Sequence, residues 1–170
     1  MIYMRSDKSK NNRRIAVIVD DRESKSEVIK FLSETKNVSV DIKRLSLGDY
    51  LVDNRLIFER KTLNDFALSI IDGRLFSQAI RLASSKYNSV LLLEGTGKEL
   101  TETGIRREAM QGALIAVSIV LGIPVLRSKS PSESAQLILY TARQIKSLAR
   151  GAVQRHGRRP KGKRKKQLFI

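Results

Sequence analysis

Two acidic residues and a lysine stand out in the stretch LGDYLVDNRLIFERK, residues 47–61 of this 170-residue chain. Strand-forming residues separate Asp49 from Glu59 and Lys61. If residues 53–55 form a three-residue hairpin loop, Asp49 lies opposite Glu59, and strand alternation places Lys61 on the same face. A two-residue loop would instead put Asp49 on the face opposite Glu59. The loop length therefore decides whether these side chains can share a site.

In the three-residue register, the two carboxylates repel each other, and a hard, oxygen-seeking cation between them relieves the repulsion. Such a cation polarises a phosphoryl oxygen and lowers the pKa of bound water. A nearby lysine can position that water or offset developing negative charge. The spacing thus favours metal-assisted hydrolysis of a phosphodiester. The residues alone also fit a solvated edge strand, whose charges keep other strands from pairing with it.

The elements that must position these residues alternate between strand and helix patterns. We expect strands at 15–20, 38–45, 50–52, 56–60, 89–94 and 124–128, and helices at about 24–35, 62–71, 74–86, 105–121 and 132–149. This alternation favours an α/β layered domain. We divide the chain into a basic leader (1–14), one folded domain (15–150) and a basic flexible tail (151–170).

Basic residues dominate the charge of the chain. It holds 33 Lys and Arg against 17 Asp and Glu, a net charge of +16. Residues 155–166 include eight basic residues and no acid, so the rest of the chain is also basic. This balance predicts a polyanionic partner, either nucleic acid or an anionic membrane surface.

The sequence also argues against several classes of protein. No run reaches the about 18 apolar residues of a membrane span, and the first residues lack the apolar region of a signal peptide. The absence of cysteine excludes disulfides and thiolate metal sites. We expect an intracellular protein of the cytoplasm or nucleoid (of the nucleus in a eukaryote), with no membrane attachment.

The stretch GDYLVDNRLIFERKTLNDF resembles the signature of the XPF-type structure-selective endonucleases, including archaeal XPF and Hef-like members. That signature is Gly-Asp, a variable gap, Glu-Arg-Lys, three residues and Asp, here Gly48, Asp49, Glu59, Arg60, Lys61 and Asp65. Upstream, VDDRE (19–23) is similar to the family's Asp-x-Arg-Glu motif. Downstream, SIIDGRLFSQAIRL (69–82) resembles its Asp-Gly-Arg segment. The similarity covers about residues 15–150, the nuclease domain.

The resemblance implies a restriction-endonuclease-like, PD-(D/E)XK fold, with a central mixed sheet flanked by helices. It also implies dependence on Mg²⁺ or Mn²⁺, and incision of branched or flap DNA near a junction between duplex and single strand. A sliding clamp or another repair protein is a further expected partner. Family members usually continue into a tandem helix-hairpin-helix domain, whereas this chain ends about where that domain would start. We therefore expect a fragment or a minimal form.

The catalytic residues follow from the same resemblance. It implies that Asp20, Asp49 and Glu59 are metal ligands, that Glu23 is a further acid in the site, and that Lys61 positions the nucleophilic water. For Asp20 and Glu23 the sequence leaves a structural alternative. Both precede an expected helix, where acids complement the positive end of the helix dipole.

Three arginines and one aspartate complete the expected site. The resemblance implies that Arg22, Arg60 and Arg74 contact DNA. Strand alternation turns the Arg60 side chain away from its neighbours, so its backbone carbonyl can matter more than its guanidinium. Arg74 begins a helix, a position suited to phosphate. Asp65 either supports the site or completes a capping box with Thr62.

The helix expected at 105–121 is apolar almost all round along ALIAVSIVL (113–121). Such a helix is either a central core element, or packs one face on the sheet and the other on a second subunit. The second interpretation agrees with the dimeric nuclease domains of the resembled family, and predicts a homodimer through this helix.

Two other functions are compatible with parts of the sequence. One is a non-catalytic DNA-binding or dimerisation scaffold with the same fold, which has no need of the carboxylates and lysine. The other is an RNA- or ribosome-associated basic protein, which would not require the carboxylate cluster either.

Overall fold

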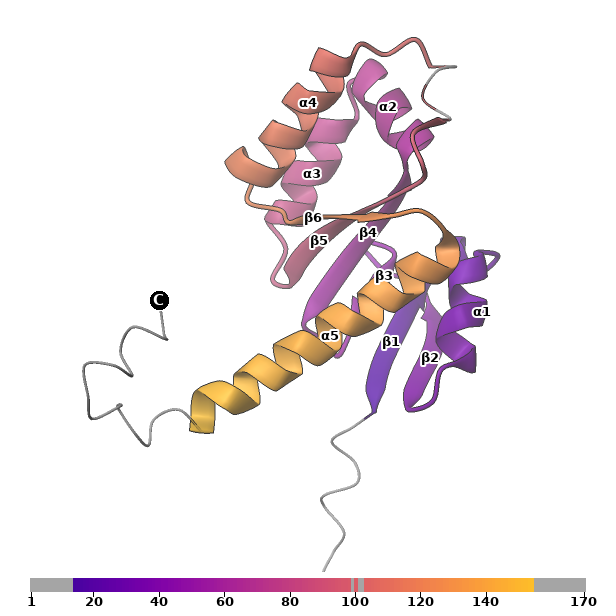
Figure 1. Cartoon of the computed structure of the whole chain (residues 1–170), viewed down its shortest axis with the longest axis vertical. Coiled ribbons are helices and arrows are strands. Elements are labelled where there is room, and N and C mark those ends of the chain that lie inside the picture. Colours follow the sequence, from indigo (N-terminus) through magenta and orange to yellow (C-terminus); the bar gives the residue numbers. More distant parts are fainter. Residues whose placement is uncertain (1–13, 99, 101–102, 155–170) are drawn as a thin grey trace, which may run out of the picture.

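A six-stranded sheet forms the centre of the computed structural model, which describes residues 14–98, 100 and 103–154 (Figure 1). Its strands are β1 (Ile15–Asp20), β2 (Val38–Lys43), β3 (Tyr50–Val52), β4 (Leu56–Thr62), β5 (Asn88–Glu94) and β6 (Val125–Ser128). They lie in the order β2-β1-β3-β4-β5-β6. The pairs β1–β3 and β3–β4 are antiparallel and the others parallel. The expected mixed sheet is confirmed.

Helices occupy three of the connections between strands and follow the last strand. They are α1 (Glu27–Glu34), α2 (Leu63–Ile71), α3 (Leu75–Ala83), α4 (Arg107–Ile115) with the π-helical segment η4 (Ala116–Val120), and α5 (Pro131–Gln154). The first helix begins three residues later than expected, because a 3₁₀ turn (Asp21–Glu23) comes first and Ser26 caps the helix by accepting from the Val28 N–H. At the other end, α5 continues through residue 154, past the predicted domain boundary at 150.

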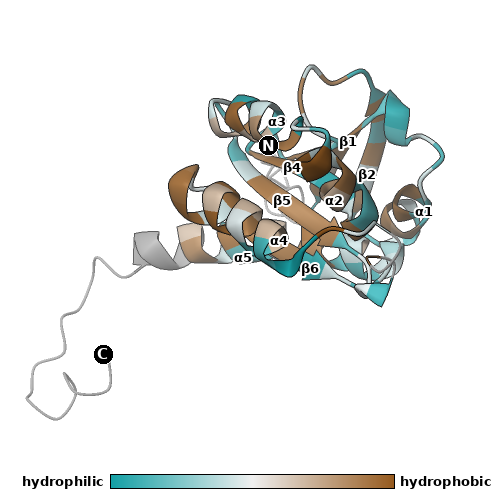
Figure 2. Ribbon diagram, turned by 90° about the horizontal axis from the view of Figure 1, so that it is seen from above, coloured by the Kyte–Doolittle hydropathy of each residue, from teal (hydrophilic) through white to brown (hydrophobic). Residues whose placement is uncertain are grey.

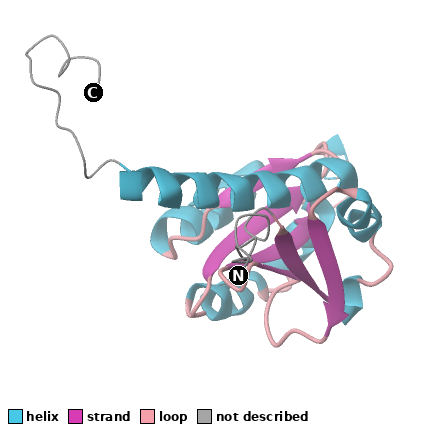
Figure 3. Ribbon diagram, turned by 90° about the horizontal axis from the view of Figure 1, so that it is seen from below, coloured by secondary structure: helices cyan, strands magenta, loops and turns pink. Residues whose placement is uncertain are grey.

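The helices cover both faces of the sheet. Helices α1 and α5 pack on one face, which we call the α5 face, around Tyr50 and Phe58. Helices α2, α3 and α4 pack on the other, which we call the α3 face, around Leu51 and Ile57. Figure 3 shows α5 crossing the sheet, and Figure 2 shows the apolar residues that the layers enclose. Side chains therefore alternate between two cores along β3 and β4.

The β3–β4 hairpin has the three-residue loop that the site requires. Its register pairs Val52 with Leu56, Leu51 with Ile57, and Tyr50 with Phe58. The loop residues Asp53 and Asn54 have left-handed backbones, with φ of 49° and 52°, a conformation that Asp and Asn tolerate better than most residues. Extending this alternation puts Asp49, Glu59 and Lys61 towards the α3 face and Arg60 towards the α5 face.

The leader and the tail lie mostly outside the described residues. Residues 1–13 and 155–170, which hold the predicted basic leader and most of the predicted flexible tail, lie outside the described residues. Within the described part, no helix is long and apolar enough to cross a membrane.

Candidate active site

A cavity of about 120 Å³ lies where the loop before β3 meets the later residues of β4. Its lining comes from the loop after Asp20, the loop before β3, β4 and α3: Arg22, Ser46, Leu47, Gly48, Asp49, Glu59, Gln78 and Arg81. Asp49 and Glu59 both line it, so the hairpin brings together the two acids that the sequence predicted to meet.

The environment of these two acids disfavours their negative charges. Burial raises the pKa of Asp49 to about 7, and the neighbouring Glu59 adds to the effect. Burial also raises the pKa of Glu59, against the opposing influence of Lys61 and Arg22. A hydrogen bond of 2.8 Å from the Arg60 N–H to Asp49 Oδ2 offsets only part of this cost. A cation bound between two carboxylates whose ionised forms are disfavoured would stabilise both negative charges.

Gly48 allows this arrangement of the backbone. Its φ of 69° lies in the left-handed region, and a Cβ at this position would come within 2.5 Å of Ile57 Cγ1. The following residue is fixed on both sides, because the Asp49 N–H donates to the Phe58 carbonyl and the Asp49 carbonyl accepts from the Asp20 N–H, each at 2.8 Å. Only glycine fits there without a shift of Ile57.

Asp20, the predicted third metal ligand, is not among the residues that line the cavity. Its side chain is 0% exposed. Oδ1 accepts from the backbone N–H and Nε of Arg22, and Oδ2 accepts from the Leu45 N–H at 2.7 Å. Burial alone would raise the pKa of Asp20, but these hydrogen bonds outweigh it and lower the pKa to about 2. Asp20 therefore fastens the loop that follows β2 to the end of β1.

The donor set fits a hard divalent cation at two residues rather than three. Within residues 14–98, 100 and 103–154, no group of three or more His, Cys, Asp or Glu side chains is arranged to hold a metal. Asp49 and Glu59 remain as a pair of carboxylates, which are the oxygen ligands that Mg²⁺ takes from proteins alongside water and phosphate.

Lys61 lies beside the acids, as the strand alternation predicted. Its Nζ donates to Gln78 Oε1 at 3.2 Å, and both side chains border a small hollow that Glu59 also lines. Gln78 comes from α3, which packs over this end of the sheet. The hydrogen bond holds the lysine amine on the side of the acids.

Two arginines bring positive charge to the cavity. Arg22 lines it, and its charge lowers the pKa of both Asp49 and Glu59. Arg81 also lines it, and Nη2 contacts the Ser46 carbonyl at 3.5 Å. The sequence analysis missed Gln78 and Arg81. Their spacing of four and seven residues from Arg74 puts all three on one side of a helix, which was the available signal.

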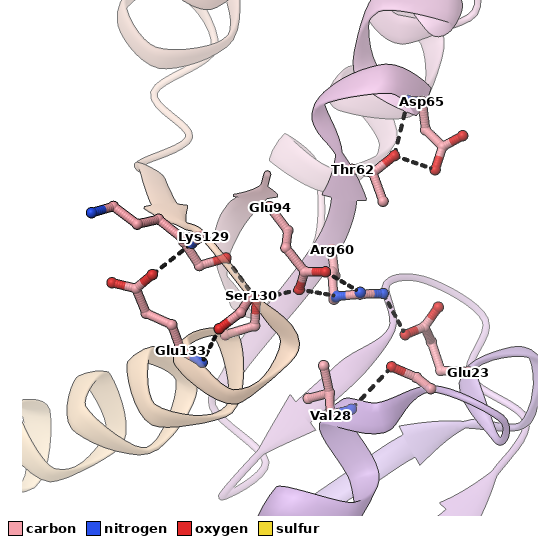
Figure 4. A network of polar contacts seen from close by, with 12 residues as sticks. Glu23, Val28, Arg60, Thr62, Asp65, Glu94, Lys129, Ser130 and Glu133 are labelled. Carbon is pink, nitrogen blue, oxygen red and sulfur yellow. Dashed lines mark hydrogen bonds and ion pairs between the residues drawn. The ribbon is translucent and has the colours of Figure 1, made fainter. Parts of the chain in front are cut away.

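Arg60 lies on the opposite face of the sheet from the cavity (Figure 4). Its side chain is 14% exposed, with Nε 2.8 Å and Nη2 2.6 Å from the two carboxylate oxygens of Glu94. Nη1 lies 3.4 Å from Glu23. This placement does not support the predicted DNA contact, because the guanidinium is occupied by the buried carboxylate of Glu94 and the partly buried one of Glu23. Alternation along β4 is the physical reason.

Glu23 belongs to the same network rather than to the lining of the cavity. Its Oε2 accepts from the Tyr50 hydroxyl at 2.6 Å, on the α5 face. It acts on the site at a distance, since its charge contributes to the raised pKa of Asp49 and Glu59.

Asp65 and Arg74 lie outside the lining of the cavity. Thr62 caps α2 and is held by Asp65: Thr62 Oγ1 accepts from the Asp65 N–H at 3.0 Å and donates to Asp65 Oδ2 at 2.7 Å (Figure 4). The capping alternative therefore describes Asp65. Arg74 is at the start of α3 as expected, with a side chain 61% exposed and paired with Asp72 at 2.6 Å.

A mixed sheet covered by helices on both faces, with an Asp and a Glu-x-Lys meeting across a hairpin, defines a restriction-endonuclease-like nuclease fold. Residues 19–141 match the family model of the ERCC4 domain. The chain therefore belongs to the ERCC4-domain family, whose members include XPF- and MUS81-type structure-specific endonucleases.

Two curated relatives show how much of a longer protein this chain resembles. It is 34% identical over 158 residues to a Methanocaldococcus jannaschii protein named as an ATP-dependent RNA helicase, covering 92% of this chain and 19% of that protein. It is 28% identical over 131 residues to the 3′-flap repair endonuclease Xpf of Saccharolobus solfataricus, covering 77% of this chain and 56% of that protein. The chain thus spans only part of each relative.

A solved structure agrees with this assignment. XPF from Aeropyrum pernix, in complex with DNA, superimposes with a TM-score of 0.72 and is 36% identical. The match covers 79% of this chain and 66% of that chain. At this identity, the likeness includes the sequence as well as the fold.

Proposed function

We propose that this chain is a metal-dependent endonuclease that hydrolyses phosphodiester bonds in branched or flap DNA, near junctions between duplex and single strand. The observation that carries the proposal is the group of Asp49, Glu59 and Lys61 on the α3 face. The two acids line the cavity together with Arg22 and Arg81, and Lys61 borders the small hollow that Glu59 also lines. The 3′-flap repair endonuclease among the relatives, and the related XPF structure in complex with DNA, support this substrate class.

Asp49 and Glu59 are the residues that would hold Mg²⁺ or Mn²⁺. When bound, such an ion supplies Lewis-acid polarisation of the phosphate and a more acidic water. Lys61, restrained by Gln78, orients the attacking water and offsets negative charge as it develops. Arg22 and Arg81 attract the phosphate and hold it against the acids. The negative charge of Glu23, on the opposite face of the sheet, raises the pKa of Asp49 and Glu59.

Incubation with labelled flap and splayed-duplex DNA tests the proposal directly. We expect incision near the junction with Mg²⁺ or Mn²⁺ and none with EDTA. Fully paired duplex of the same sequence is the substrate control, and Asp49→Asn is the protein control. Binding to all these DNAs without incision under any metal condition would instead favour the non-catalytic scaffold.

The exposed side of the α4–η4 helix supports a homodimer as part of the same proposal. Ala113 and Val117 are buried in the core, whereas Ile115, Ile119 and Val120 are 58%, 76% and 75% exposed. The segment is therefore not a central core helix, and its outer side is apolar enough to pack against a second copy. The sliding clamp or other repair partner stays a prediction.

A further inference from the structure

A buried polar network lies on the α5 face, on the other side of the sheet from the cavity (Figure 4). Arg60 and Glu94 form its centre, at the ends of β4 and β5. Both guanidinium contacts with Glu94 are short, and together they make a planar, two-point interaction. Such an interaction fixes the direction of the arginine side chain as well as its distance.

The network continues into the last helix. Ser134 Oγ, in the first turn of α5, donates to Glu94 Oε2 at 2.6 Å. Its oxygen also lies 2.7 Å from the hydroxyl of Ser128, at the end of β6. Ser134, Ser128 and Glu94 are all buried. Glu94 and Ser134 therefore join β4, β5, β6 and α5, and Arg60 is the member of this network that β4 supplies.

Residue 60 connects this network to the site through its own backbone. It lies between Glu59 and Lys61 in β4, so a rotation or shift at this position moves both of them. Its N–H also donates to Asp49 Oδ2, on the neighbouring strand end. The same residue thus has its backbone in the site on one face and its guanidinium in the network on the other.

We propose that Arg60 is a positioning residue: the Arg60–Glu94–Ser134 network sets the relative placement of Asp49, Glu59 and Lys61. The proposal deepens the proposed function and rests on it. Stability alone does not account for the network, because apolar side chains of similar size usually stabilise a core as well as a buried ion pair does. What an apolar core lacks is the two-point contact that fixes orientation.

Three variants test this role. Arg60→Lys keeps the charge but loses the two-point contact, Glu94→Gln keeps the shape but loses the charge, and Ser134→Ala removes a remote hydroxyl. The matched control is Lys146→Met, which breaks a partly buried ion pair with Asp53 at the hairpin loop, far from the cavity. All proteins are compared well below the lowest Tm in the set.

The inference predicts separate effects on turnover and on DNA binding. For Arg60→Lys and Glu94→Gln we expect a loss of about 10–100-fold in kcat and in Mn²⁺ affinity, the range typical when groups that orient ligands are changed. KM for DNA should stay within about twofold, since the guanidinium does not line the cavity. Ser134→Ala should show a smaller loss in the same two quantities, and Lys146→Met none.

Amide hydrogen exchange at Arg60 supplies a readout without metal or DNA. We expect faster exchange in the three variants, because a displaced residue 60 loses its bond to Asp49. If the wild type neither cleaves nor binds Mn²⁺, the proposed function fails, while the exchange rates still decide the positioning role.

Unchanged exchange with unchanged kcat would overturn the inference. A raised KM with unchanged kcat would also overturn it, by making Arg60 a DNA contact. Should Arg60→Lys fail to fold, Ser134→Ala decides alone, since it keeps every charge.

Discussion

Asp49 and Asp20 are joined by a backbone hydrogen bond, yet the pKa values of their carboxyl groups are shifted in opposite directions. Asp20 accepts three hydrogen bonds, and its pKa falls to about 2. The Asp49 carboxylate accepts a hydrogen bond from the Arg60 N–H, and burial beside Glu59 raises its pKa to about 7. A carboxylate that is fully satisfied by N–H donors has little to offer a cation. Asp49 is therefore the residue suited to metal chemistry.

At the residue scale, replacements in the site should remove activity without unfolding the protein. We expect Asp49→Asn, Glu59→Gln and Lys61→Ala each to lower the rate of flap-DNA cleavage by about 100-fold or more. This loss is larger than the one typical for residues that only orient the metal ligands. The acid replacements should keep or raise Tm in EDTA, because each removes a disfavoured charge. Full activity in any of the three would reject the site, and a large loss of Tm would indicate a structural role.

The raised pKa of Asp49 also predicts how stability depends on pH. Between the ordinary pKa of 3.8 and about 7, the folded protein holds a proton that the unfolded chain has released. The contribution of Asp49 to stability in EDTA should thus be fully present below about pH 4 and be lost as pH rises through about 7, whereas the lowered pKa of Asp20 acts in the opposite direction at acidic pH. Each pKa unit corresponds to about 1.4 kcal/mol, and with partial solvent screening we expect Asp49→Asn to gain about 1–2 kcal/mol at pH 8.

Urea unfolding at several pH values in EDTA measures this effect. The variant should lose less stability than the wild type between pH 5 and 8, although Glu59 still contributes a slope of the same sign. Asp41→Asn, at an exposed surface pair with Lys43, is the control and should follow the wild-type curve. Parallel curves for Asp49→Asn and wild type would contradict the assignment of the pKa.

At the element scale, β4 explains why one short strand carries two roles. Its even-numbered and odd-numbered residues face different helices, so Glu59 lines the cavity and Lys61 lies beside it, while Arg60 reaches Glu94 on the other face. A loop of one residue fewer at the hairpin would exchange these faces. Loop length at residues 53–55 therefore controls the chemistry several residues away.

The α4–η4 helix gives a second element-scale prediction. Ile119→Glu should disrupt the homodimer, because it places a charge on an apolar side that a second copy would bury. Sedimentation at micromolar concentration should give about twice the mass of one chain for the wild type, and one chain for the variant. Ile42→Glu, on the far edge strand β2, is the control for an exposed apolar residue and should leave the mass unchanged. A wild type that stays monomeric up to about 100 µM would remove the dimer.

At the scale of the whole molecule, the net charge of +16 is the dominant property. The eight basic residues of 155–166 supply half of it, and they lie outside the described part of the chain. The described body is basic as well, and Arg22 and Arg81 already line the cavity. DNA binding is therefore expected to have one contribution from the body and another from the tail.

Deleting residues 155–170 separates the two contributions. Each phosphate contact contributes about 0.9 to the slope of log affinity against log salt, so with half the tail charges engaged the slope should flatten by about 3–4. Turnover at saturating DNA should be little changed, because the acids lie elsewhere. Flap binding at several salt concentrations, with and without the tail, gives the measurement. An unchanged slope means that the body alone binds the DNA.

The sequence by itself determined the elements and the pair of acids. Strand alternation, helix periodicity and turn residues are local properties, so the six strands, their helices and the facing of Asp49, Glu59 and Lys61 could be predicted. Helix ends were less certain, because a neighbouring serine provides an equally good cap, as Ser26 does in place of Ser24.

Only the tertiary structure decided which further side chains contact Asp20, Arg60 and Lys61. Asp20 follows a strand that ends near the site, yet its carboxylate is taken by Arg22 and by the Leu45 N–H, a contact across 25 residues. Arg60 forms an ion pair with Glu94, a residue 34 positions later in the chain, and Lys61 donates a hydrogen bond to Gln78 on α3. Partners such as these depend on how the layers pack, and no local spacing encodes them.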